Sequence, residues 1–162
     1  MQRLIAIKPT SIVIGLALLL SACGFQPRGS VPISADKQHV YLTATQAHSA
    51  LQTVLAQAFS DNGVTLTNQA PYTLKLEQTT FDRDSSVIST SGVVSVYTVR
   101  LEVSYTISEP HSQTTRTFTE VLERNYSYDA NAAAANEEQE ATIKQELLQA
   151  SANRIIRRFV NF

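Results

Sequence analysis

The sequence predicts an α+β fold in which a four-stranded, mostly antiparallel sheet carries two helices on one face. Three patterns support this class: a short β-branched run near residue 39, two segments with apolar residues at helical spacing, and long segments in which apolar and polar residues alternate. In chain order they give strand, helix, three strands and helix. This order favours a two-layer sandwich whose second sheet face is open to solvent or to a partner.

The first strand and helix are predicted over residues 39–61. Residues 39–43 form the strand, and a right-handed crossover is expected to lead to the next one. Gly63 follows the helix and suits the left-handed position after its end. The apolar stripe of this helix consists of Ala47, Ala50, Leu51, Val54, Leu55, Ala58 and Phe59.

The three following strands are predicted from alternation. The first has Tyr72, Leu74 and Leu76 on one face. A turn at residues 109–112, which contains Pro110, joins two long strands into a hairpin. The inward residues of the hairpin are Val93, Ser95, Tyr97, Val99, Leu101, Val103, Tyr105 and Ile107 on one strand, and Phe118, Leu122, Tyr126 and Tyr128 on the other.

A second helix is predicted to end the chain. Asn131 or Asn136 is expected to cap it, with Glu137, Glu138 and Glu140 in its first turn. Its apolar residues recur every three or four positions: Ile143, Leu147, Leu148, Ala152, Ile155 and Phe159.

The outward face of the sheet is predicted to be rich in hydroxyl groups. Its members include Thr98, Ser104, Thr106, Thr115, Thr117 and Thr119. An ordinary solvated face is the simpler interpretation, because a one-faced antiparallel sheet normally has a polar side. The alternative is a contact surface for sugars or for a polar protein wall.

The N-terminus resembles the export signal of a bacterial lipoprotein. Arg3 and Lys8 precede an apolar run at residues 12–20, and small residues at 21 and 22 lead to Cys23. The run is shorter than the roughly 20 residues that span a bilayer. We expect residues 1–22 to be cleaved and Cys23 to receive S-diacylglyceryl and N-acyl groups. Residues 23–37, which contain two prolines and two glycines, then form a tether, and residues 38–162 form one domain.

Charge and composition exclude several classes of function. Without Arg3 and Lys8 the chain has 13 − 2 = 11 basic and 14 acidic residues, a net charge of −3. The one basic cluster, Arg154, Arg157 and Arg158, suits the C-terminus of a helix, so nucleic-acid binding is disfavoured. The three histidines, at positions 39, 48 and 111, lack metal-ligand spacing, and no nucleophile or phosphate-loop motif is present. The sequence therefore indicates a binding or assembly protein without a cofactor, not an enzyme.

The sequence resembles the LptE family, the lipoprotein subunit of the outer-membrane lipopolysaccharide translocon. The resemblance rests on Cys-Gly-Phe-Gln-Pro-Arg-Gly at residues 23–29, on the order of elements, and on residues 131–158, with their Asn/Ala-rich start, acidic turn and terminal Ile-Ile-Arg-Arg. It implies a plug inside an LptD-type β-barrel that assists barrel assembly and lipopolysaccharide insertion. Gly24, where an inner-membrane retention signal has Asp, implies the periplasmic face of the outer membrane.

The resemblance also implies that basic side chains near the sheet bind lipopolysaccharide. The candidates are Arg83, Arg100, Arg116 and Arg124, since guanidinium groups pair well with phosphates. Each could instead pair across strands with Glu102, Glu120 or Glu123, and we expect this for Arg100. Arg116 and Arg124 are therefore the predicted lipopolysaccharide-binding residues.

Two alternatives of other classes remain at this stage. A general envelope lipoprotein that binds peptidoglycan or scaffolds another outer-membrane assembly complex would explain the anchor and the sheet equally well. A cell-wall enzyme would need a pair of catalytic groups in a cleft, which the sequence does not supply.

Overall fold

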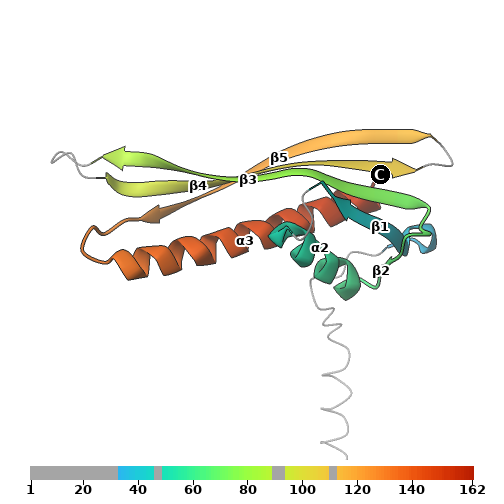
Figure 1. The fold of residues 1–162 in the computed structure, drawn as a ribbon, viewed down its shortest axis with the longest axis horizontal. Helices are drawn as coiled ribbons and strands as arrows, with labels where there is room; N and C mark the ends of the chain where they lie inside the picture. The colour runs from blue at the N-terminus through green and yellow to red at the C-terminus, as the bar shows by residue number, and fades with distance from the viewer. Residues whose placement is uncertain (1–32, 46–48, 89–93, 110–112) are drawn as a thin grey trace, which may run out of the picture. The chain divides into compact units, whose positions relative to one another are not determined.

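A computed structural model describes residues 33–45, 49–88, 94–109 and 113–162. Both helices lie on the same side of one sheet (Figure 1), which confirms the predicted α+β class. The elements are η1 (Ala35–Lys37), β1 (His39–Ala44), α2 (Ala50–Asp61), β2 (Thr65–Leu66), β3 (Tyr72–Ile88), β4 (Val94–Glu109), β5 (Thr114–Ser127) and α3 (Ala133–Val160). The predicted export signal and Cys23 lie outside the described residues.

The sheet has five strands, so the prediction of four was wrong. Their order is β2-β1-β3-β4-β5, and β1 runs parallel to both of its neighbours while β3, β4 and β5 are antiparallel. The extra strand is β2, because the amides of Thr65 and Thr67 donate to the carbonyls of Gln38 and Val40 at 2.8 and 3.1 Å. Two residues are too few to produce a periodic signal in the sequence.

Helix α2 begins and ends close to the predicted residues. The Ser49 hydroxyl accepts a hydrogen bond from the amide of Gln52 at 3.1 Å and caps the first turn. Gly63 has φ +76°, the left-handed conformation predicted for it, in which a side chain would be strained. Leu51, Leu55 and Phe59 are fully buried, whereas Ala50 is exposed and does not belong to the apolar stripe. Ala47 lies outside the described residues.

Helix α3 begins at Ala133, one residue after the start that an Asn131 cap would give and four before the start that an Asn136 cap would give, so neither asparagine caps it. Its N-cap is Ala132, since the alanine-rich residues 132–135 have the highest helix propensity. Asn136 is buried inside the first turn, where its side chain donates to the Asp129 carbonyl at 2.6 Å and accepts from the Asp129 amide at 3.2 Å. The three predicted first-turn glutamates therefore lie beyond that turn.

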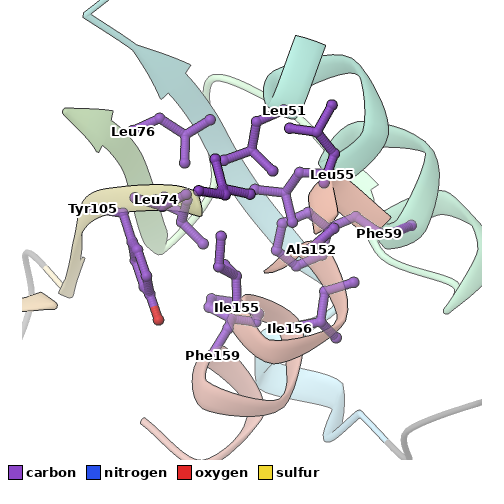
Figure 2. Packing of buried hydrophobic residues seen from close by; sticks show 14 of the residues in the cluster. Leu51, Leu55, Phe59, Leu74, Leu76, Tyr105, Ala152, Ile155, Ile156 and Phe159 are labelled. Atoms are coloured by element: carbon purple, nitrogen blue, oxygen red, sulfur yellow. The ribbon is translucent and has the colours of Figure 1, made fainter. Parts of the chain in front are cut away.

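The apolar core lies between the helices and the sheet (Figure 2). Phe159 of α3 packs edge-to-face on Phe59 and Tyr72, with ring centroids 5.5 and 5.7 Å apart. The inward residues of β4 from Val99 to Ile107 are fully buried, as their alternation predicts, and Leu122 and Tyr126 of β5 complete this face. Val93 lies outside the described residues.

A β-bulge in β3 changes which residues face the helices. Leu76 pairs with Tyr105 and Gln78 with Ser104, so Glu77 is one extra residue in the ladder. Even-numbered residues of β3 face the helices before this point. Odd-numbered ones from Thr79 to Ser85, including Arg83, face them after it, up to a second register shift beyond Ser85.

Candidate functional site

The open face of the sheet carries a ladder of hydroxyl groups, as predicted. Cross-strand pairs of β4 and β5 bond to one another: Ser104 with Thr119 at 3.1 Å, and Thr106 with Thr117 at 3.2 Å. Further along β4, Thr98 donates to the Asn125 side chain at 2.8 Å. Since these groups alternate with the fully buried residues of β4, they form one continuous polar strip on the side away from the helices.

Charged groups on this open face pair with one another. The Arg100 guanidinium lies 3.8 Å from the Glu102 carboxylate and 3.6 Å from that of Glu123. The predicted cross-strand pairing of Arg100 is thus confirmed. Tyr41 and Val121, 41% and 39% exposed, add apolar contact area on the same face. A surface of hydroxyls, compensated charge and isolated apolar groups suits contact with a polar partner.

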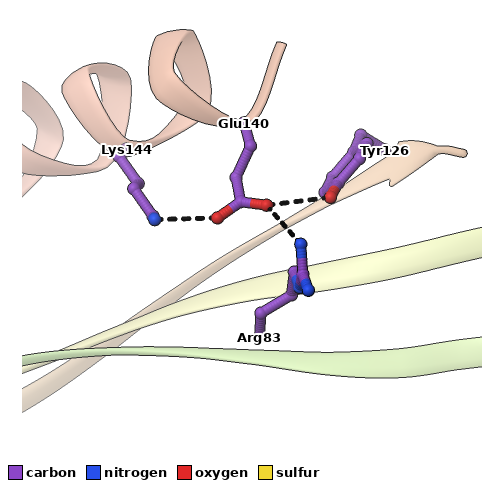
Figure 3. Close-up of polar contacts among 4 residues, drawn as sticks. All are labelled: Arg83, Tyr126, Glu140 and Lys144. Atoms are coloured by element: carbon purple, nitrogen blue, oxygen red, sulfur yellow. Dashed lines mark hydrogen bonds and ion pairs between the residues drawn. The ribbon is translucent and has the colours of Figure 1, made fainter. Parts of the chain in front are cut away.

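Arg83 lies on the helix side of the sheet because of the β3 bulge. Its guanidinium bonds the Glu140 carboxylate at 2.9 Å, and the same carboxylate accepts from Lys144 at 2.7 Å and from the Tyr126 hydroxyl at 3.0 Å (Figure 3). These bonds, with Lys144 first, lower the pKa of Glu140 to about 2 against the opposing effect of burial. Arg83 therefore joins β3 to α3, a role that strict alternation along the strand does not reveal.

Arg116 and Arg124 both lie on β5 but are not brought together. They are eight residues apart, which is about 26 Å along a strand. Both are exposed on the face that also carries Leu122 and Tyr126. Arg124 donates to the Glu123 carbonyl at 3.3 Å, and Arg116 lies over the Phe162 ring at 5.7 Å. Within the described ranges, neither has a carboxylate at ion-pair distance.

A second group of charged residues lies where β5 meets the end of α3, and the sequence did not predict that these residues lie together. Glu120 of β5 is half-buried and accepts a hydrogen bond from the buried Ser151 hydroxyl at 2.5 Å. Burial raises the pKa of Glu120 above its ordinary value, while the hydrogen bond and nearby arginines oppose this shift. The carboxylate lines an open hollow of about 410 Å³ together with Arg154, Arg157, Arg158 and Asn161. In the sequence, only Ser151, a polar residue within the apolar stripe of α3, could have indicated the contact with Glu120.

The described residues contain neither a metal-binding cluster nor a membrane-spanning helix. No three His, Cys, Asp or Glu side chains there are placed to hold a metal ion. No helix in those ranges is both long and apolar enough to cross a bilayer. His48 and His111 lie outside the described ranges, whereas His39 is exposed at the start of β1.

A single helix-backed sheet with a polar open face is the architecture of a binding or assembly module. The LptE family model, described as lipopolysaccharide-assembly, matches residues 31–159. The chain belongs to the LptE family. A comparison with curated proteins gives no match.

Solved lipoprotein structures share the fold. The rare lipoprotein B of Shewanella oneidensis superposes with a TM-score of 0.70 at 18% identity, over 76% of this chain and 94% of that one. A minor lipoprotein of Acinetobacter baumannii gives 0.64 at 21%, over 80% and 94%. A lipoprotein B of Nitrosomonas europaea gives 0.59 at 19%, over 85% and 90%. At these identities the likeness concerns the fold alone.

Proposed function

We propose that this protein is a lipid-anchored outer-membrane subunit that binds and plugs an LptD-type β-barrel. In this role it assists assembly of the barrel and insertion of lipopolysaccharide, and it performs no catalysis itself. Cys23 carries the lipid, which holds the domain at the periplasmic side of the membrane and raises its concentration near the barrel. Membership of the LptE family supports the class of function.

The ladder of hydroxyl groups on the open face is the main structural observation that supports a role as a barrel plug. The interior of a large outer-membrane barrel is polar. A plug therefore needs a rigid surface of hydroxyls and compensated charges, such as the pairs Ser104–Thr119 and Thr106–Thr117 beside Arg100. In the proposal, this face contacts the barrel wall while the helices complete the core behind it.

The proposal is tested by recovering the tagged protein from outer membranes in mild detergent. Stoichiometric recovery of one large β-barrel supports it, and recovery of the lipoprotein alone or of peptidoglycan fragments contradicts it. Thr119→Glu adds a charge to the exposed ladder, so recovery of the barrel should fall several-fold. Thr53→Glu, on the exposed surface of α2, is the matched control and should leave recovery unchanged.

Arg116 and Arg124 are proposed to bind the phosphate groups of lipopolysaccharide. Both are exposed, and guanidinium groups bind phosphate in bidentate geometry. Because they lie at opposite ends of β5, each would hold a different anionic group. Arg124→Gln and Arg116→Gln should each weaken lipopolysaccharide binding by about tenfold in titrations of the purified protein. Arg100→Gln, whose guanidinium is paired with two carboxylates, is the control, and an equal loss there would contradict the assignment.

A further inference from the structure

Three arginines near the end of α3 form one exposed surface, which we call the arginine patch. Arg154, Arg157 and Arg158 are spaced by three and four residues, so they share one face of the helix. With Glu120 and Asn161 they line the open hollow of about 410 Å³. Glu120 is the one carboxylate among these lining residues.

The arginine patch carries uncompensated positive charge. Glu120 is turned into the fold by its bond to Ser151, and no carboxylate of the described residues lies within 4.0 Å of the three guanidinium groups. With Glu120 ionised, three cations and one anion leave a surplus of 3 − 1 = 2. The Arg158 guanidinium carbon lies 4.8 Å from the centroid of the Phe118 ring, a cation–π contact that does not use the N–H donors of the guanidinium.

The patch also lies where the chain enters the folded domain. The Lys37 ammonium donates to the Val160 carbonyl at 2.8 Å, so the last residue of the predicted tether is bound to the last turn of α3. Asp36, the neighbouring carboxylate, accepts a hydrogen bond from the Tyr72 hydroxyl at 3.5 Å. Lys37 is fourteen positions after Cys23, and fourteen residue steps span at most about 50 Å.

We propose that the arginine patch binds the anionic phospholipid headgroups of the leaflet that holds the Cys23 lipids. The inference rests on the proposed lipidation and names a second membrane contact for the same protein. Arginine forms bidentate hydrogen bonds with phosphate, and a basic patch beside a lipid chain is a recognised second signal for membrane attachment. An anionic leaflet attracts such residues within about one Debye length, so the short tether keeps them in range.

Headgroup binding at this point fixes the direction of the domain. The Lys37–Val160 bond and the start of β3 lie at one end of the β3–β4 pair, where Thr73 pairs with Ser108. Glu120, which lines the hollow of the patch, pairs with Val103 and lies nearer this end than the other. The other end of the pair, where Ile88 pairs with Val94, then points away from the anchored leaflet.

The test uses the full lipidated chain in vesicles without any barrel. Since Cys23 is the one cysteine of the sequence, Asn153→Cys provides a single labelling site beside the patch, and Ala135→Cys provides one about 27 Å away along α3. Energy transfer to acceptor-labelled headgroups is measured in neutral phosphatidylcholine vesicles and in vesicles with about 30% phosphatidylglycerol. We expect transfer from position 153 to exceed that from 135 in anionic vesicles, and this difference to disappear at about 0.5 M salt.

Arg154→Gln combined with Arg157→Gln should reduce the transfer from position 153 by about half or more. Arg100→Gln combined with Lys75→Gln removes the same charge from paired surface residues and should leave it unchanged. Equal transfer in neutral and anionic vesicles, or no effect of the patch variant, would overturn the proposal. The proposal would also be overturned if Arg154→Gln combined with Arg157→Gln left the energy transfer unchanged but reduced recovery of the barrel from outer membranes. That result would assign the patch to a protein partner. Failure of the chain to float with neutral vesicles would instead remove the Cys23 anchor on which the proposal rests.

Discussion

Along α3, the turns around Phe159 contact the rest of the fold through buried rings, whereas the turn around Glu140 contacts the sheet through charge and hydrogen bonds. Phe159 is fully buried against Phe59 and Tyr72. Glu140 binds Arg83, Tyr126 and Lys144, and both of the cations remain partly exposed. Apolar burial thus provides most of the stability at one end. Polar bonds determine how the other end of the helix meets the long strands.

Replacing Phe159 with alanine should have the largest effect. The substitution removes a fully buried ring and leaves a cavity, which costs about 3–5 kcal/mol in the free energy of unfolding. Urea denaturation followed by circular dichroism measures this loss. Val160→Ala, next to it and only partly buried, should cost about 1 kcal/mol or less. Similar losses for the two variants would contradict the central place of Phe159 in the core.

Replacing Glu140 with glutamine should have a smaller effect. The substitution removes the charge that Lys144 and Arg83 share, at a cost of about 1–3 kcal/mol in the free energy of unfolding. Glu138→Gln, on an exposed position of the same helix, is the control and should stay within about 0.5 kcal/mol of the parent.

The stabilising effect of Glu140 should depend on pH. Since its pKa is lowered to about 2 in the folded protein, the folded state binds fewer protons at this group than the unfolded state does. The difference in stability between the parent and Glu140→Gln is therefore complete above about pH 4.5 and declines as the pH falls toward 2. Denaturation curves at several pH values measure it, and a difference that grows on acidification would show the pairing to be wrong.

Asn136→Ala tests whether this side chain fixes the connection between β5 and the first turn of α3. The buried side-chain amide of Asn136 bonds both the backbone N–H and the backbone carbonyl of Asp129. Removing it leaves both groups without that partner, which should lower the free energy of unfolding by about 1–2 kcal/mol. Asn131→Ala, which removes an exposed side chain, should cost clearly less. Hydrogen exchange of residues 129–137 should accelerate in the first variant. Unchanged exchange would mean that the alanine-rich start holds the helix by itself.

The smallest expected effect is a gain in stability. Tyr105 is fully buried, and its hydroxyl has no hydrogen-bond partner among the described residues, while burial raises its pKa to about 12. Tyr105→Phe removes a polar group that was left unpaired, so the free energy of unfolding should stay equal or rise by about 1 kcal/mol. A loss of more than about 1 kcal/mol would show that the hydroxyl is bonded after all.

The apolar contacts between the helices and the sheet could be predicted from the sequence, whereas the polar contacts around Glu140 could not. The alternation along β4 identifies the buried residues from Val99 to Ile107, and Gly63 marks the end of α2, because both depend on local patterns. The side of the sheet on which Arg83 lies depends on the single extra residue at Glu77, which leaves no local signal. The start of α3 at Ala133 lies between the starts expected from Asn131 and Asn136 as caps, and it depends on the helix propensity of the alanine run.

The same contrast applies to the candidate site. The hydroxyl face and the pairing of Arg100 follow from strand alternation, and both were predicted. The contact of Glu120 with Ser151 beside the arginines depends on how β5 and α3 meet. This contact joins two residues that are 31 positions apart in the chain, so it can be identified only from the three-dimensional structure.

Photo-crosslinking in living cells would show whether the open hydroxyl face contacts a barrel wall. A photoreactive amino acid is placed at Thr117, on the exposed hydroxyl ladder, or at Thr53, on the outer surface of α2. We expect position 117 to form a crosslink to one large β-barrel protein and position 53 to form a weaker one. Crosslinks from position 53 alone, or none to a barrel from either position, would contradict this contact.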